Sequence, residues 1–160
     1  MHQGNERLTL KDFMIMKKLG LIISAVFLTL GVACADVDRP ISVEELPQKA
    51  QKFLKAHFSE RDVSFAKEDP EFMYKDYEVV LTDGTKIEFA SDGEWTSVDC
   101  RYGSVPMAIV PKQIEDYLKK NYPNVTVLGI DHERKEYEVR LNNRLELTFD
   151  KHFRLIDIDD

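Results

Sequence analysis

The chain of 160 residues has few of the side chains that support catalysis, with two cysteines, one tryptophan and four histidines. It is also short of positive charge: 22 lysines and arginines against 29 aspartates and glutamates give a formal net charge of -7. This balance disfavours nucleic acid, which requires clustered positive charge, and favours solubility or a basic partner.

Catalytic motifs are missing as well. The chain has no glycine-rich phosphate loop, no His-Glu-x-x-His, no Gly-x-Ser-x-Gly and no Cys-x-x-Cys. His2, His57, His132 and His152 are scattered and are expected to be solvated. A zinc site built from His132, Glu133 and a distant ligand is the alternative. We therefore expect no catalytic residue, no bound metal and no cofactor.

The one long apolar run lies near the N-terminus. Lys17-Lys18 precede the run Leu19 to Val32, and the small residues Ala33-Cys34-Ala35 follow it. This arrangement is typical of a secretory signal peptide, and the run is short for a membrane span. Residues 1-35 are predicted to be an N-terminal extension and signal peptide, which places the mature protein in the periplasm or outside the cell.

Two ways of processing this leader remain open. Cleavage after Ala35 would release a soluble protein, whereas Leu30 to Cys34 resembles a loosened bacterial lipoprotein signal that would attach a lipid to Cys34. Either route leaves Cys100 without a partner, so no intramolecular disulfide is expected. Cys100 is predicted to be a small, partly buried residue.

The rest of the sequence contains an internal repeat. Leu46 to Lys55 returns as Val110 to Lys119, and Tyr77 to Leu81 returns as Tyr137 to Leu141. A self-similarity with a period of about 60 to 64 residues predicts one supersecondary unit duplicated around a joint core. The expected segments are a linker at 36-43, repeat 1 at 44-101, a linker at 102-109 and repeat 2 at 110-160.

Each repeat is predicted to be a helix followed by antiparallel strands. Pro47 and Pro111 stand where a helix tolerates proline, and apolar residues then recur at helical spacing. The pattern changes to strict alternation further on, interrupted by the turn dipeptides Asp83-Gly84 and Asp92-Gly93.

Two such units predict a two-layer α+β domain, with both helices on one face of an antiparallel sheet of up to eight strands. Alternation assigns these residues to the side facing the helices: Tyr77, Val79, Leu81, Ile87, Phe89, Val98, Tyr137, Val139, Leu141, Leu145, Leu147, Phe149, Ile156 and Ile158. It assigns these to the helix-free side: Glu78, Val80, Lys86, Glu88, Trp95, Ser97, Glu138, Arg140, Glu146, Thr148, Leu155 and Asp157.

This pattern resembles the PepSY-like secreted proteins related to the β-lactamase-inhibitor-protein (BLIP) fold. The resemblance covers about residues 44-160 and rests on the Pro-x-x-Ile/Ala-x-x-Tyr/Phe-Leu helix and the Tyr-Glu-Val strand. It implies a secreted or periplasmic protein in a family of mostly unknown role, whose namesake clamps a protein loop against the helix-free face of its sheet. The shared motifs are structural, so no inhibitory residue is carried over.

The preferred function is a non-enzymatic binding or inhibitor-like protein that uses the helix-free face to engage a protein or peptide of the envelope or the extracellular space. The predicted contact residues are Trp95, Arg140, Leu155, Val80 and Lys86. Trp95 is the candidate anchor, because a large aromatic on a polar face is typical of binding hot spots; the alternative is that it folds against the sheet rim or under the linker. We expect a monomer that touches a membrane only through a lipid on Cys34.

Other functions remain open. One is a small metal-dependent hydrolase using acidic groups with His132 or His152, and another is a PepSY-type module that regulates a peptidase or senses a signal. The acidic end Asp157 to Asp160 suggests calcium, although a solvated strand edge is the simpler interpretation because Asp157 and Asp159 alternate with Ile158.

Overall fold

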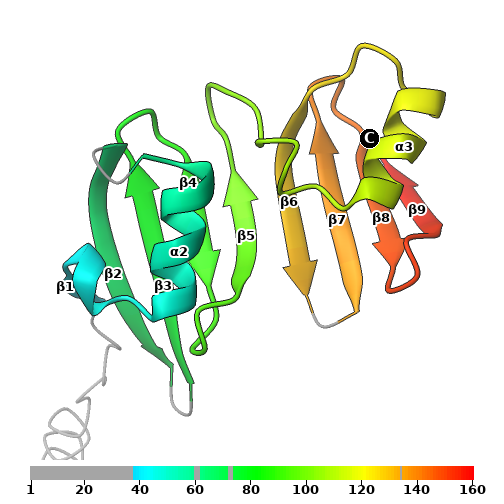
Figure 1. Ribbon diagram of the computed structural model, residues 1–160. Helices are drawn as coiled ribbons and strands as arrows, with labels where there is room; N and C mark the ends of the chain where they lie inside the picture. Colours follow the sequence, from blue (N-terminus) through cyan, green and yellow to red (C-terminus); the bar gives the residue numbers. More distant parts are fainter. Residues whose placement is uncertain (1–37, 60–61, 72–73, 134) are drawn as a thin grey trace, which may run out of the picture. The chain divides into compact units, whose positions relative to one another are not determined.

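A computed structural model of the chain describes residues 38-59, 62-71, 74-133 and 135-160. The predicted signal peptide and the lipidation candidate Cys34 lie outside these residues. The α+β class is confirmed, since two helices accompany a sheet in which every neighbouring pair of strands is antiparallel (Figure 1).

The two helices form where the apolar spacing predicts them. Helix α2 spans Gln48–His57 and helix α3 spans Lys112–Asn121, and each has a proline, Pro47 or Pro111, at its N-cap. The buried residues lie four apart, Ala50 with Leu54 and Ile114 with Leu118. This spacing aligns one face of each helix with the core.

The described strands form one sheet in which the order along the chain is also the order in space. A short 3-10 turn, η1 (Val43–Glu45), joins the first strand to α2. The strands are β1 (Arg39–Ile41), β2 (Val63–Glu71), β3 (Tyr74–Leu81), β4 (Lys86–Phe89), β5 (Trp95–Asp99), β6 (Val127–Glu133), β7 (Glu136–Leu141), β8 (Glu146–Asp150) and β9 (Leu155–Asp159).

Both helices pack on the same face of this sheet (Figure 1). Phe53 of α2 meets Phe89 of β4 at 5.7 Å between ring centroids, and Tyr117 of α3 meets Phe149 of β8 at 5.4 Å. One row of paired residues runs beneath them across all the strands: Ile41, Ala66, Val79, Ile87, Val98, Ile130, Val139, Leu147 and Ile158. All but the two at the sheet edges are buried.

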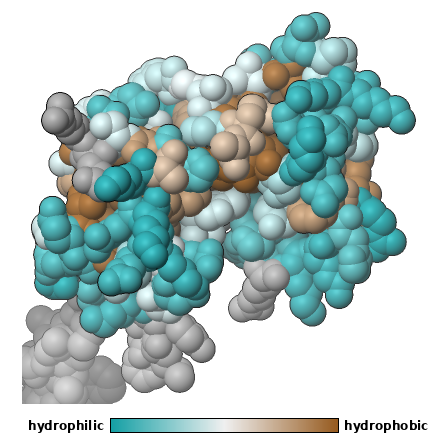
Figure 2. Space-filling view, in the orientation of Figure 1, coloured by the Kyte–Doolittle hydropathy of each residue, from teal (hydrophilic) through white to brown (hydrophobic). Residues whose placement is uncertain are grey.

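The predicted linkers contribute to the fold. Residues 36-43 contain β1, which pairs with β2. In the linker before α3, the Val105 N–H donates to the carbonyl of Val127 at 2.9 Å, and both Val105 and Ile109 are buried. Figure 2 shows hydrophobic surface gathered in the middle of the helix-bearing face, between the regions of α2 and α3.

The predicted hairpin turns form with the backbone that their glycines allow. Gly84 has φ +84° and Gly93 has φ +82°, a left-handed conformation that L-residues with a side chain adopt at a cost. The later hairpins place Arg144 (φ 74°) and Phe153 (φ 60°) in that conformation. The second half of the chain therefore carries backbone strain that the first half avoids.

The alternation prediction is wrong at Trp95 and Leu155. The pairing of β4 with β5 shifts between Glu88 and Phe89, so that Phe89 pairs with Trp95; the pairing of β8 with β9 shifts in the same way, so that Phe149 pairs with Leu155. A β-bulge adds one residue to a strand and breaks the alternation from there on. Both side chains pack against the core on the helix-bearing side.

Candidate functional site

Three of the predicted contact residues do lie on the helix-free face. Val80 pairs with Lys86 and Lys86 with Asp99, while Arg140 follows two strands further along the same row, next to Gly129. Their chain neighbours Val79, Ile87 and Val139 are fully buried on the opposite side of the sheet. The Lys86 ammonium group forms ion pairs with Glu88 at 2.7 Å and with Glu78 at 2.9 Å, and these carboxylates raise its pKa.

Trp95 takes part in an aromatic cluster on the other side. Its ring lies 6.0 Å from that of Phe53 and 5.7 Å from that of His132, and His132 stacks on Tyr137 at 4.3 Å. His132 was expected to be solvated, but it is only partly exposed here. Trp95 is therefore a packing residue of the helix layer and lies outside the helix-free face.

Carboxylates dominate the helix-free face. The row that crosses its centre consists of paired residues from β2 to β9: Lys67, Glu78, Glu88, Ser97, Asp131, Glu138, Thr148 and Asp157. Like charges on directly paired residues destabilise a sheet. Lys86 bridges Glu78 and Glu88, whereas selection for stability alone would not be expected to place Asp131 opposite Glu138.

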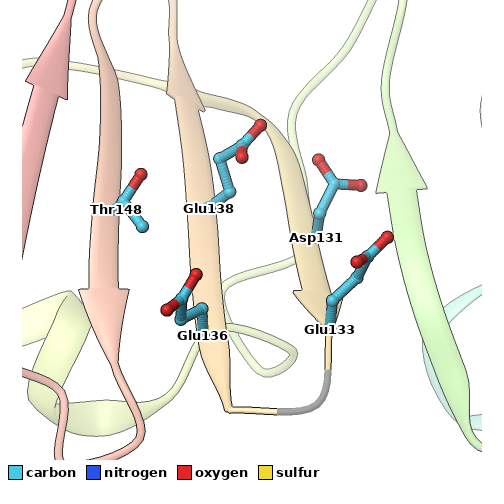
Figure 3. Close-up of a pocket in the computed structure, with 5 residues that line it drawn as sticks. All are labelled: Asp131, Glu133, Glu136, Glu138 and Thr148. Carbon is cyan, nitrogen blue, oxygen red and sulfur yellow. The ribbon is translucent and has the colours of Figure 1, made fainter.

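A hollow on this face has a volume of about 360 Å³ and is lined by Asp131, Glu133, Glu136, Glu138 and Thr148. In Figure 3 the acidic side chains of β6 and β7 project from the same side of the sheet, with Thr148 of β8 beside them. The sequence signal was present, since both strands carry acidic residues two apart, but the sequence analysis did not group them. Their meeting depends on the pairing of Asp131 with Glu138.

The hollow changes the acidity of its carboxyl groups. Burial, together with the neighbouring Glu146 and Asp131, raises the pKa of Glu138 to about 7, and burial also raises the pKa of Asp131. Glu138 is therefore partly protonated at neutral pH, and a cation placed beside it would favour loss of that proton.

A smaller hollow of about 130 Å³ lies in the first half of the sheet, which consists of β1 to β5. Its lining includes Asp69, Asp76, Glu78 and Glu88. Burial, followed by repulsion from Asp69 and Glu88, raises the pKa of Asp76. Carboxyl groups with raised pKa values thus line a hollow in both halves of the face.

Arg140 of β7 reaches across the junction of β5 and β6, where the two halves of the sheet meet. It contacts Asp99 of β5 at 3.4 Å and Asp131 of β6 at 4.0 Å. The guanidinium group passes over Gly129: a Cβ built on that glycine would lie 2.3 Å from the Arg140 Nη2 atom. Gly129 is therefore the opening that lets Arg140 reach β5 from β7.

Three further observations concern the described part of the chain. Cys100 is buried, and burial raises the pKa of its thiol, which suits the predicted packing role. Among residues with described positions, no three His, Cys, Asp or Glu side chains are grouped to hold a metal ion. Neither α2 nor α3 in the described residues has the length and the hydropathy that a membrane-spanning helix needs.

Comparison with known proteins identifies the class. Residues 75–157 match the family model described as "Putative beta-lactamase-inhibitor-like, PepSY-like". The chain belongs to this PepSY-like family, as the resemblance predicted. No curated protein sequence matches it.

Three solved structures of similar proteins come from Bacteroides. One from Bacteroides thetaiotaomicron, described as a "putative calcium-regulated periplasmic protein", is 52% identical, covers 79% of this chain and 99% of its own, and has a TM-score of 0.76. One from Bacteroides vulgatus, described as a "putative periplasmic protein", is 45% identical, with the same coverage and TM-score. A third, of unknown function from the same species, is 36% identical over 78% of this chain and all of its own, with a TM-score of 0.72.

Proposed function

We propose that this protein is a non-enzymatic periplasmic binding module that engages a basic protein or peptide segment with the helix-free face of its sheet. The observation that carries the proposal is the carboxylate-rich row across that face, in which acidic residues are paired with each other. The predicted signal peptide and the periplasmic relatives support the location.

The acidic hollow on β6–β8 is the proposed contact point for a lysine or arginine side chain. Charged partners on complementary surfaces associate faster and more specifically, and the effect weakens with salt. Because the pKa of Glu138 is about 7, arrival of a cation releases a proton. Binding is therefore expected to tighten as the pH rises from 6 to 8.

Val80, Lys86 and Arg140 remain in the proposed surface. Lys86 and Arg140 divide the carboxylates into separate clusters, since each is held by acidic neighbours on its own part of the face. A partner must place its basic groups at the acidic hollows and away from these two cations, which gives selectivity beyond net charge.

The test is isothermal titration with a capped octalysine peptide at low and at physiological salt. The triple variant Glu133→Gln, Glu136→Gln, Glu138→Gln removes three of the four carboxylates that line the hollow and should bind at least fivefold more weakly. A control, Glu44→Gln, Glu94→Gln, Asp116→Asn, removes three exposed carboxylates elsewhere and should bind within twofold of the parent. Equal losses in both variants would mean that only net charge matters, which contradicts the proposal.

A second candidate function is a response to calcium, favoured by the relative from Bacteroides thetaiotaomicron and by the oxygen-rich hollow. Calcium takes six to eight oxygen ligands, and the described side chains are not grouped to supply them. Calcium would have to bind by rearranging Asp131 and Glu138, in competition with a basic partner.

This candidate is tested by following backbone amide signals during titration with calcium chloride, with magnesium chloride as the control. Saturable shifts at β6 and β7 that calcium causes and magnesium does not would support it. Small, linear shifts that both ions cause alike would remove it and leave the basic-partner proposal intact.

We also infer that the two halves descend from one duplicated unit, as the sequence self-similarity predicts. A helix followed by four strands occurs twice in the same order, and the bulge falls between the last two strands in each half. On this view the two acidic hollows are equivalent, and one partner with two basic groups can occupy both.

A further inference from the structure

The outer edge of β9 resembles the edge of β5 that pairs with β6 in the same sheet. β9 is the last strand in the sheet order and pairs with β8 on one side; none of the described strands pairs with its other side. Ile156 and Ile158 are 54% and 45% exposed along this strand. An open strand edge offers unpaired backbone groups for another strand to join.

Strand β5 is the equivalent of β9 in the first half of the chain, and a further strand pairs with its outer edge. β5 follows β4 as β9 follows β8, with the same register shift, and Ser97-Val98-Asp99 occupies the place of Asp157-Ile158-Asp159. β6 covers the outer side of β5, pairs Ile130 with Val98 and buries Val98 completely. Asp99 meets the cationic group of Arg140 at 3.4 Å across this junction.

The backbone at β9 satisfies its outward N–H group locally. At the covered edge, the Cys100 N–H donates to the Leu128 carbonyl across the junction at 2.8 Å. Because the direction of N–H groups alternates along a strand, Val98 and the corresponding Ile158 also direct their N–H groups outward. The Ile158 N–H instead donates to Oδ1 of Asp157 at 3.0 Å.

We propose that the β9 edge binds an extended peptide strand with one apolar residue flanked by two basic residues. The apolar residue pairs with Ile158, and its carbonyl replaces Asp157 as the acceptor of the Ile158 N–H. The freed Asp157, and Asp159 beyond it, then pair with the basic side chains on the helix-free side. Strand addition of this kind takes its affinity from the backbone and its specificity from alternate side chains.

Charge argues against a second copy as the occupant. Antiparallel pairing of two β9 strands about Ile158 would set Asp157 of each copy opposite Asp159 of the other, and like charges in that position are destabilising. The proposed contact is the backbone edge of β9, whereas the proposed function concerns the face of the inner strands. The two can be tested separately.

The probe is a capped peptide, Thr-Thr-Thr-Lys-Val-Arg-Thr-Thr-Thr, followed by amide chemical shifts and hydrogen exchange. We expect saturable shifts confined to β8 and β9, with at least fivefold slower exchange of the Ile158 amide. The same peptide with an N-methylated valine should bind at least tenfold more weakly, because the methyl group removes the N–H that pairs with Ile158.

Protein variants separate side-chain from charge effects. Ile158→Lys should weaken binding at least fivefold, whereas Met107→Lys, at a similarly exposed apolar residue (43%), should not change it. Asp157→Asn with Asp159→Asn should also weaken binding at least fivefold and tests the same contact without altering Ile158.

Three results would overturn the inference. One is absence of saturable shifts at β9. Another is equal binding of the N-methylated peptide with shifts over β3, β4, β6 and β7, which would leave the proposed function standing. The third is a dimer in sedimentation equilibrium whose formation shifts the β9 amides, since a second copy would then occupy the edge.

Discussion

Replacing Gly129 by alanine should detach Arg140 from β5 without unfolding the protein. The new Cβ would lie 2.3 Å from Nη2, 2.6 Å from Cζ and 2.9 Å from Nε of Arg140. All three atoms belong to the end of a flexible side chain, so the side chain can move while the backbone stays in place.

The cost to stability is expected to be small. Arg140 and its two acidic partners are between about a quarter and a half exposed, and ion pairs of that kind contribute about 0 to 1 kcal/mol. Substituting glycine by alanine where the backbone permits it stabilises by about 0.4 to 1 kcal/mol through the unfolded state. The two effects offset each other, so the free energy of unfolding should change by less than about 1 kcal/mol.

The effect on acidity should be clear. Arg140 lowers the pKa of both Asp131 and Glu138, so its displacement should raise both pKa values. Carboxyl ¹³C shifts followed against pH measure this in Gly129→Ala and in Arg140→Ala. Unchanged pKa values in both variants would refute the assigned role of Arg140.

Four further outcomes follow from the packing and charges. Trp95→Ala should lower the free energy of unfolding by about 2 to 3 kcal/mol in urea titration. An unchanged free energy of unfolding would contradict the packing of Trp95 against the core. Phe89→Ala, at a fully buried ring, should cost about 3 to 5 kcal/mol, and a cost below 1 kcal/mol would contradict the described core. Arg144→Gly, which supplies the residue that suits φ 74°, should raise the midpoint of thermal unfolding. Because the folded pKa of Glu138 lies above its ordinary value, its stabilising contribution is lost as the pH rises from about 4.5 to about 7. Glu138→Gln should therefore be more stable than the parent at pH 8, and equal stability at that pH would contradict the raised pKa.

The sequence predicted much of the fold because its signals are local. Apolar spacing placed both helices, and Asp83-Gly84 and Asp92-Gly93 placed two turns, since each feature depends on residues close together in the chain. The side of the sheet on which Trp95 lies could not be predicted in this way. It depends on a bulge, which is a relation between β4 and β5.

The candidate site was predicted only in part for the same reason. Val80, Lys86 and Arg140 were placed correctly on the helix-free face, because simple alternation holds in β3, β4 and β7. The hollow was missed, because its acidic residues come from two strands whose register fixes which carboxylates meet. The opening at Gly129 was missed as well, since the sequence does not show which side chain crosses a glycine.

The most direct test of the proposed function is to map where octalysine binds at physiological salt, using amide shifts and paramagnetic broadening from a spin-labelled peptide. We predict saturable effects centred on Asp131 and Glu138 that weaken from pH 8 to pH 6. Effects centred on α2 and α3, or spread evenly over the surface and independent of pH, would contradict it.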